Sequence, residues 1–312
     1  MSRFLVILLS FITLFVPREK YERKVAQIVD MDQKHAGWNF QGWEYKSVSK
    51  PGSDFIHRYY EYPSPNDSAP VFLFFHGLIL DGRTFTNMTS LADSWRLIAY
   101  DIPESTSRYM GSMKDFVEIT SEFVELMHFT SCNVCGVSFG GGIALRLAAD
   151  KIVDVKNLVL ISTGIVGNTR REQRRQHIMA EWVKDIPDYK LYWFMEKVYK
   201  RTAKEYEDDT TGIKQLFRVK DVDFFRQVVQ AMDGYDAGAY AKKVSCPVLL
   251  LSGSEEDVFS DKQVKRIKKY IPQAQSEIIE GGTHAMVFRQ GDNVAGEIRE
   301  FCSSHGSTAS PK

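Results

Sequence analysis

A serine lies at the centre of the most informative motif in this chain of 312 residues. The motif Gly136-Val137-Ser138-Phe139-Gly140 follows an apolar run typical of a strand and precedes a run typical of a helix. Glycines on either side of a serine allow a tight turn there, because neighbouring backbone can approach without a Cβ clash. Such a turn lifts the hydroxyl clear of the sheet and aims the N-terminus of the next helix at a reacting carbonyl. The motif therefore predicts that Ser138 is a nucleophile.

A second motif, His76-Gly77, directly follows the apolar run Val71–Phe75. With the two motifs together, the chain resembles the α/β-hydrolase superfamily, whose oxyanion loop begins with His-Gly after an apolar strand. The resemblance implies that two backbone N–H groups form the oxyanion hole, those of Leu78 and Phe139. It also implies that His76 braces this loop rather than acting in catalysis.

A serine hydroxyl needs an adjacent base at neutral pH. The resemblance implies that the base is His284, in Gly281-Gly282-Thr283-His284, because the family places its catalytic histidine after the last strand. The family's acid lies in the loop after the penultimate strand, which contains Glu256 three residues beyond Gly253 and then Asp257. We expect Asp257 to be the acid, because Asp is the commoner residue and Asp257 begins an Asp-x-x-Ser pattern, with Glu256 as the alternative.

Alternating apolar strands and helices must position these groups. Trp43–Val48 and Phe55–Tyr60 alternate and flank turn residues, which predicts a hairpin. Continuous apolar runs then predict buried strands at 71–75, 97–100, 133–135, 157–162, 248–251 and 276–279, with a helix over 113–127 between two of them. The predicted fold class is α/β, a mostly parallel central sheet with helices on both faces.

One stretch interrupts this alternation. Residues 165–243 contain helical, charged and aromatic-rich sequence without a buried strand run. We expect a helical cap inserted before the penultimate strand, on a hydrolase core of residues 40–164 and 244–302. Within this cap, Arg170, Arg171, Arg174 and Arg175 recur at helical spacing, which favours a solvated face; contact with anionic lipid headgroups is the alternative.

The N-terminal segment, residues 1–17, is predicted to be an anchor or a signal. Residues 4–16 are almost wholly apolar, but a helix of this length spans only about 20 Å of a hydrocarbon core of about 30 Å. We expect membrane contact through 4–16, with the body in the cytoplasm because basic residues follow the segment. The alternatives are export after signal cleavage and a helix packed on the body.

Composition narrows the function classes. The 40 basic residues balance 40 acidic ones, so no basic excess indicates a nucleic-acid partner. The sequence has no P-loop, dinucleotide fingerprint or metal cluster, and we expect no cofactor. Cys132 and Cys135 resemble half of a zinc or redox site, but side chains at i and i+3 of a strand point to opposite faces, so we expect two buried thiols.

The predicted function is hydrolysis of a carboxylic ester by a serine hydrolase. An aromatic-rich cap and an apolar N-terminus favour a small-molecule or lipid substrate with a lipophilic acyl group, and in this combination the chain resembles capped monoacylglycerol lipases. The same triad could serve a carbon–carbon bond hydrolase, a thioesterase or an enol-lactone hydrolase. A non-catalytic scaffold is the alternative from another class.

Overall fold

The structure, a computed structural model, forms two compact units. The helical unit comprises 1–38, 104–113 and 168–235, and the sheet unit comprises 39–103, 114–167 and 236–312. Within these segments the structure describes residues 16–27, 42–66, 68–78, 80–103, 108–164, 169–204, 221–256, 258–259 and 261–306. Of residues 201–204 and 261 it describes only the backbone.

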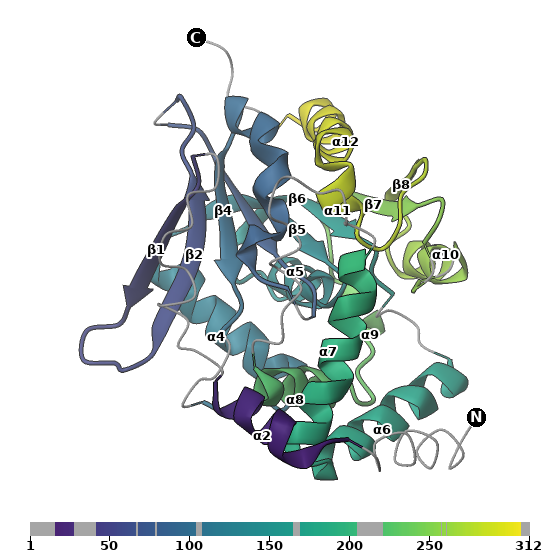
Figure 1. The fold of residues 1–312 in the computed structure, drawn as a ribbon. Coiled ribbons are helices and arrows are strands. Elements are labelled where there is room, and N and C mark those ends of the chain that lie inside the picture. Colours follow the sequence, from purple (N-terminus) through teal and green to yellow (C-terminus); the bar gives the residue numbers. More distant parts are fainter. Residues whose placement is uncertain are drawn as a thin grey trace. The chain divides into compact units, whose positions relative to one another are not determined.

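In the described part of the sheet unit, eight strands form one sheet, in the order β1-β2-β4-β3-β5-β6-β7-β8 (Figure 1). The strands are β1 (Glu44–Ser49), β2 (Ile56–Tyr62), β3 (Val71–Phe75), β4 (Arg96–Asp101), β5 (Ser131–Val137), β6 (Asp154–Ile161), β7 (Val248–Gly253) and β8 (Gln275–Ile279). The pairs β1–β2 and β2–β4 are antiparallel, and every other pair is parallel. The predicted fold class is therefore confirmed, including the N-terminal hairpin and all eight strand positions.

The continuous apolar runs form central strands because helices cover the sheet on both faces. In β3, Phe72 to Phe75 are fully buried. Phe72 and Phe74 stack with ring centroids 4.7 Å apart on one face, whereas Phe75 packs edge-on against Tyr100. Alternate residues of a strand point to opposite faces, so a strand with covers on both faces needs apolar residues at every position.

Seven helices belong to the sheet unit in its described part: η2 (Gly82–Asp93, a 3-10 helix), α4 (Met113–Leu126, in this unit from residue 114), α5 (Phe139–Ala149), α9 (Gly238–Ala241), α10 (Asp261–Tyr270), α11 (Met286–Arg289) and α12 (Gly291–Ser304). Side chains of η2, α11 and α12 share one apolar core with Phe72 and Phe74. On the other face, Phe123 of α4 stacks on Tyr100 with centroids 4.4 Å apart.

The helical unit consists of α2 (Arg18–Ala26), α6 (Arg170–Asp185), α7 (Asp188–Lys204) and α8 (Val222–Ala231) among its described residues. Aromatic rings join α6 to α7, where Trp182 and Phe194 meet edge-on with centroids 5.2 Å apart. The described residues between β6 and β7 contain no strand, as the sequence predicts. Whether 165–243 acts as a cap stays a prediction.

The predicted apolar segment 4–16 lies outside the described residues except for Val16. None of the described helices has the length and apolar character that crossing a membrane requires. The nearest described element is α2, which belongs to the helical unit.

Candidate active site

Ser138 occupies a strained turn between β5 and α5. Its backbone has φ 51° and ψ −114°, a region that residues with a Cβ rarely adopt. The Ser138 N–H donates to the Ile161 carbonyl at 2.9 Å, and its own carbonyl accepts from the Gly141 N–H at 3.1 Å. The Thr163 hydroxyl donates to the same carbonyl at 2.9 Å. These bonds hold the strained residue in place at the carboxyl end of β5.

The glycines around Ser138 are required by close backbone contacts. A Cβ on Gly140 would lie 2.3 Å from the Phe75 carbonyl oxygen, and one on Gly136 would lie 2.4 Å from the Gly140 carbonyl oxygen. Any side chain there would push the start of α5 away from β3 and β5. The two glycines thus let the helix begin directly above the sheet.

The loop after β3 lies against the nucleophile. A Cβ on Gly77 would be 3.3 Å from the Ser138 Cβ, so this loop and the serine turn are in near contact. Leu78 follows in this loop, and Phe139 is the first residue of α5. The first N–H groups of a helix have no acceptor within the helix, which leaves the Phe139 N–H available to a ligand.

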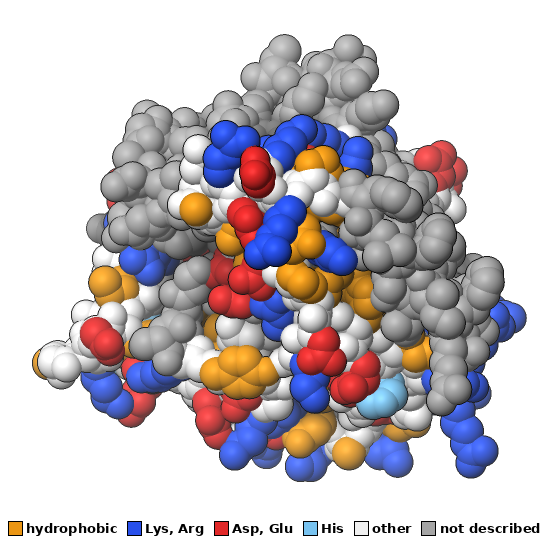
Figure 2. All heavy atoms as spheres, turned by 60° about the horizontal axis from the view of Figure 1, so that its bottom comes forward, with side chains coloured by type: hydrophobic (Ala, Val, Ile, Leu, Met, Phe, Trp, Pro, Cys, Tyr) orange, Lys and Arg blue, Asp and Glu red, His pale blue; other side chains and the backbone are white. Residues whose placement is uncertain are grey.

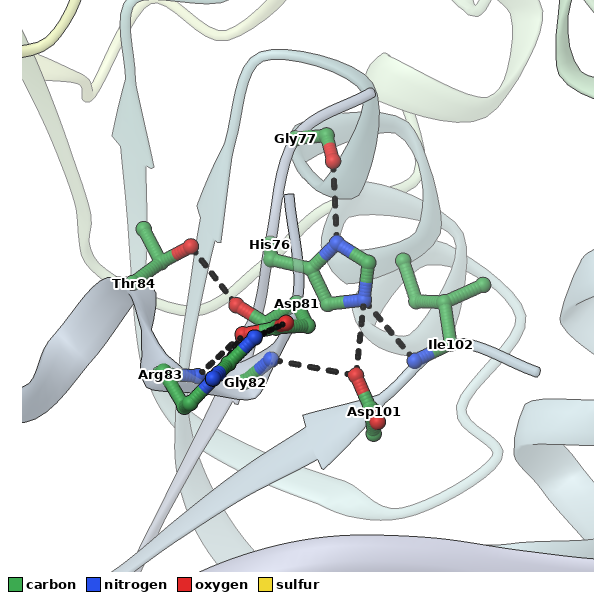
Figure 3. Close-up of polar contacts among 8 residues, drawn as sticks. All are labelled: His76, Gly77, Asp81, Gly82, Arg83, Thr84, Asp101 and Ile102. Carbon is green, nitrogen blue, oxygen red and sulfur yellow. Dashed lines mark hydrogen bonds and ion pairs between the residues drawn. The ribbon is translucent and has the colours of Figure 1, made fainter. Parts of the chain in front are cut away.

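His76 holds this loop to the end of β4. The buried ring accepts the Ile102 N–H at Nε2 (2.9 Å), so Nδ1 carries the proton and donates to the Gly77 carbonyl at the same distance (Figure 3). One donor and one acceptor describe a neutral imidazole. The Gly77 carbonyl belongs to the peptide that contains the Leu78 N–H, so His76 orients that N–H directly.

A buried ion pair holds the other side of the loop. Both Arg83 and Asp81 are almost completely buried, and the guanidinium donates to the carboxylate through Nε at 2.9 Å and Nη2 at 2.6 Å. Burial acts against the charge of Arg83, but Asp81 outweighs it and raises the pKa of the guanidinium. Asp101 accepts the Gly82 N–H at 3.1 Å. Figure 3 shows the His76 ring and Asp101 on the same side of this pair; His76 directly follows β3, and Asp101 is the last residue of β4.

His284 makes its hydrogen bonds with Glu256. The distance from His284 Nδ1 to each carboxylate oxygen of Glu256 is 3.1 Å. An ionised carboxylate only accepts, so Nδ1 carries the proton and Nε2 of the neutral ring keeps its lone pair. The Glu256 side chain is 4% exposed and the His284 side chain 30%. Burial would raise the pKa of Glu256, but the hydrogen bond from His284, together with the attraction of the carboxylate to that ring when it is protonated, outweighs burial and lowers the pKa.

Contacts between two distant loops set this pairing. The N–H groups of Ser254 and Glu255 donate to the carbonyls of Ile279 and Gly282 at 3.0 and 2.8 Å. A Cβ on Gly253 would lie 1.9 Å from the Gly282 carbonyl oxygen, so the backbones touch there. Glu256 also accepts the Val258 N–H at 2.8 Å. The loop register is thus fixed by backbone bonds to the histidine loop, with Glu256 directed inward.

The sequence favoured Asp257 over Glu256 as the partner of His284, and the hydrogen bonds favour Glu256. Asp257 itself lies outside the described residues. The signal for Glu256 was its position three residues beyond Gly253.

Within the described residues, Ser138 Oγ and the His284 ring share no hydrogen bond. The sequence analysis missed the Asp81–Arg83 pair. The feature that could have indicated it is two opposite charges, two residues apart, directly after the apolar residues 78–80.

The cysteine pair does not form a binding site with other described residues. Cys132 and Cys135 are both buried, free thiols. Burial raises the pKa of Cys132 to about 12 and that of Cys135 well above its ordinary value. Metal binding and thiol exchange need the thiolate, so both groups are unreactive here. No cluster of three metal-ligating side chains occurs in the part of the chain that the structure describes.

The sequence pattern of the alpha/beta hydrolase family matches residues 72–297, which includes every motif described above. The chain belongs to the alpha/beta hydrolase family. Among curated proteins, the poly(3-hydroxyalkanoate) depolymerase of Ectopseudomonas oleovorans is 23% identical over 226 residues, which cover 70% of this chain and 78% of that protein. The predicted family and the assignment to a hydrolase superfamily are thus confirmed.

Solved structures of other alpha/beta hydrolases share this fold. The enol-lactonase of Burkholderia xenovorans superposes with a TM-score of 0.69 at 16% identity, over 83% of this chain and all 100% of that one. A thermophilic esterase of Thermogutta terrifontis gives 0.67 at 18%, over 84% and 99%. A putative lipase of Acinetobacter baumannii gives 0.68 at 19%, over 91% and 96%. At these identities the likeness shows the fold alone, and the three proteins are named for different activities.

Proposed function

We propose that this alpha/beta hydrolase cleaves a carboxylic ester through an acyl-enzyme intermediate on Ser138. The observation that carries the proposal is the hydrogen bond from His284 Nδ1 to the buried Glu256 carboxylate. It fixes the imidazole in the tautomer whose Nε2 can accept a proton. A histidine oriented by a carboxylate, in a fold whose elbow presents a serine, is the arrangement that activates a hydroxyl.

In the proposed reaction, Ser138 Oγ attacks the ester carbonyl while His284 Nε2 takes its proton. Glu256 stabilises the imidazolium that forms. The N–H groups of Leu78 and Phe139 stabilise the negative oxygen of the tetrahedral intermediate, which collapses when His284 protonates the leaving alcohol. Water, deprotonated by His284, then attacks the acyl carbon, and the proton passes from His284 to Ser138 Oγ as the bond to the acid breaks. A serine–histidine bond is often long before substrate binds, so the geometry without substrate agrees with this sequence of steps.

The proposed substrate is a small-molecule or lipid ester with a lipophilic acyl group. The segment 165–243 follows β6 in the chain, and the sheet neighbours of β6, β5 and β7, end at the serine turn and the acid loop, so we propose that the segment forms a cap. We further propose that residues 4–16 contact the membrane from a cytoplasmic body. A panel of p-nitrophenyl esters, monoacylglycerols and thioesters would rank the substrate classes.

Labelling with a fluorophosphonate tests the nucleophile. Wild-type protein should be labelled on Ser138, and Ser138→Ala should lose labelling and on the order of a millionfold in ester turnover while keeping its melting temperature. Ser121→Ala is a matched control, because it makes the same chemical change on α4 and leaves the nucleophile in place. Turnover of Ser138→Ala within tenfold of wild type would contradict the proposal.

Two isosteric substitutions test the acid. Glu256→Gln should lose about four decades of turnover, because an amide no longer selects the active tautomer of His284. Asp257→Asn changes the adjacent carboxylate and should lose less than about tenfold. The reverse order would make Asp257 the acid and leave Glu256 a structural residue.

A further inference from the structure

The first two turns of α6 carry a dense group of unpaired charges. Arg170, Arg171, Arg174 and Arg175 are all exposed. Within the described residues, none of the four makes an ion pair or a hydrogen bond through its guanidinium. At 100° per residue the four side chains cover an arc of about 140°, so they form one surface of the helix. We call this surface the α6 arginine face.

The α6 arginine face is unfavourable for the helix that carries it. Arg170 and Arg174 are like charges four residues apart, as are Arg171 and Arg175, and such pairs repel. All four lie near the positive end of the helix macrodipole, where acidic side chains are preferred. The one acid in the first turn, Glu172, is already engaged, because its carboxylate accepts from the Thr169 N–H and hydroxyl at 2.7 Å each.

Packing does not account for this half of α6 either. The buried residues of α6 are Ala180, Trp182 and Val183, all in its second half. The first half is held in helical form by the capping box between Thr169 and Glu172. A local arrangement that opposes folding and contributes no buried residue among those described indicates a binding surface. Its chemistry requires a partner with several negative charges.

The α6 arginine face belongs to the same unit as the element that follows the apolar N-terminal segment. In this unit Lys24 of α2 pairs with Glu196 of α7, and Tyr21 donates to Glu196 at 3.2 Å. Arg18, Lys20 and Arg23 of α2 are exposed. Figure 2 shows the face of the molecule that includes these helices, with Lys and Arg side chains spread among hydrophobic and acidic ones.

The two units divide the balanced charge of the chain unequally. The segments of the helical unit contain 21 basic and 17 acidic residues, and those of the sheet unit contain 19 and 23. The helical unit is therefore positive and the sheet unit negative. An anionic partner is attracted to the first and repelled by the second.

We propose that the α6 arginine face binds the anionic surface of a phospholipid bilayer. Stable attachment of a peripheral protein needs two signals, and a basic surface in the unit that adjoins apolar residues 4–16 supplies the second. Guanidinium groups bind phosphate oxygens through two parallel N–H bonds, which suits arginine rather than lysine to headgroups. The proposal is independent of the proposed ester chemistry, since lipid binding is measured without turnover.

Co-sedimentation of the full chain with vesicles tests the proposal. Wild type should partition at least about tenfold better into phosphatidylcholine vesicles with about 30% phosphatidylserine than into pure phosphatidylcholine, and added salt should reduce the preference. Replacing all four arginines by glutamine, a comparable helix former, should abolish the preference. Binding to pure phosphatidylcholine, the melting temperature and turnover of a soluble p-nitrophenyl ester should remain unchanged.

Helix α10 offers a matched control. Its four exposed lysines, Lys262, Lys265, Lys268 and Lys269, belong to the sheet unit, and their replacement by glutamine removes the same charge. This control variant should keep the wild-type preference for phosphatidylserine. Equal losses in both variants would show a general charge effect and overturn the proposal. A wild type without any preference would also overturn it and would direct the search to an acidic protein partner.

Discussion

Arginines at two places in this molecule meet opposite environments. Arg83 is 2% exposed and donates through two nitrogens to Asp81, which is itself fully buried. The α6 arginine face is exposed and has no acidic partner among the described residues. Arg83 has its acidic partner, Asp81, two residues before it in the chain. The acid near the start of α6, Glu172, is instead bonded to Thr169 in the helix cap.

The difference shows how the same side chain can serve folding or binding. A buried charge must be paired, because transfer out of water is otherwise costly, and Arg83 and Asp81 pair with each other where η2 begins. An exposed charge stays solvated and contributes little to stability, so the α6 arginines are free to bind a partner. The Glu256–His284 contact is intermediate in exposure, because the Glu256 side chain is buried and the His284 side chain is partly exposed.

The largest effect is expected at the buried pair. Arg83→Met should lower the free energy of unfolding by about 3–5 kcal/mol, because it leaves Asp81 buried without its cation. Arg170→Met makes the same chemical change on the α6 arginine face and should leave stability unchanged or slightly improved. Urea denaturation of both variants measures the difference. Equal stability of the two would show that burial of Arg83 does not matter, and would undo the comparison.

An intermediate, pH-dependent effect is expected at Glu256. Its pKa is lowered in the fold, so its ionised form contributes stability above the ordinary value of 4.5, and that contribution is lost as pH falls through the lowered pKa. Wild type should therefore exceed Glu256→Gln in melting temperature near neutral pH, and this difference should shrink as pH falls below 4.5. Glu255→Gln makes the same chemical change at the exposed neighbour and serves as the matched control. A pH-independent gap for Glu256→Gln would contradict the charge argument.

The smallest effect is expected at the cap of α6. Thr169→Ala removes the hydroxyl that accepts the Glu172 N–H and should destabilise the first turns by about 1 kcal/mol. Because those turns carry no core contact among the described residues, amide hydrogen exchange should speed up in residues 170–175 with little change in the global melting temperature. Thr89→Ala, in η2, provides a threonine control outside α6. A large global loss would show that the start of α6 supports the fold.

Much of the fold followed from local patterns in the sequence. Continuous apolar runs located the buried strands, and Gly136, Ser138 and Gly140 located the elbow, because sterics at a strand-to-helix turn leave little choice of residue. The histidine motif after the last strand was equally local. These features need no knowledge of distant contacts, so the sequence by itself determined them.

The tertiary structure decided which neighbours each charged group meets. Glu256 and Asp257 are adjacent, and a shift of one residue in a loop exchanges their directions. The bonds from Ser254 and Glu255 to the histidine loop, some 25 residues away, set that register. Burial of Arg83 and pairing of Lys24 with Glu196 likewise depend on segments far apart in the chain. The pattern of residues fixes which elements form, but the environment of a charge depends on the packing of several elements at once.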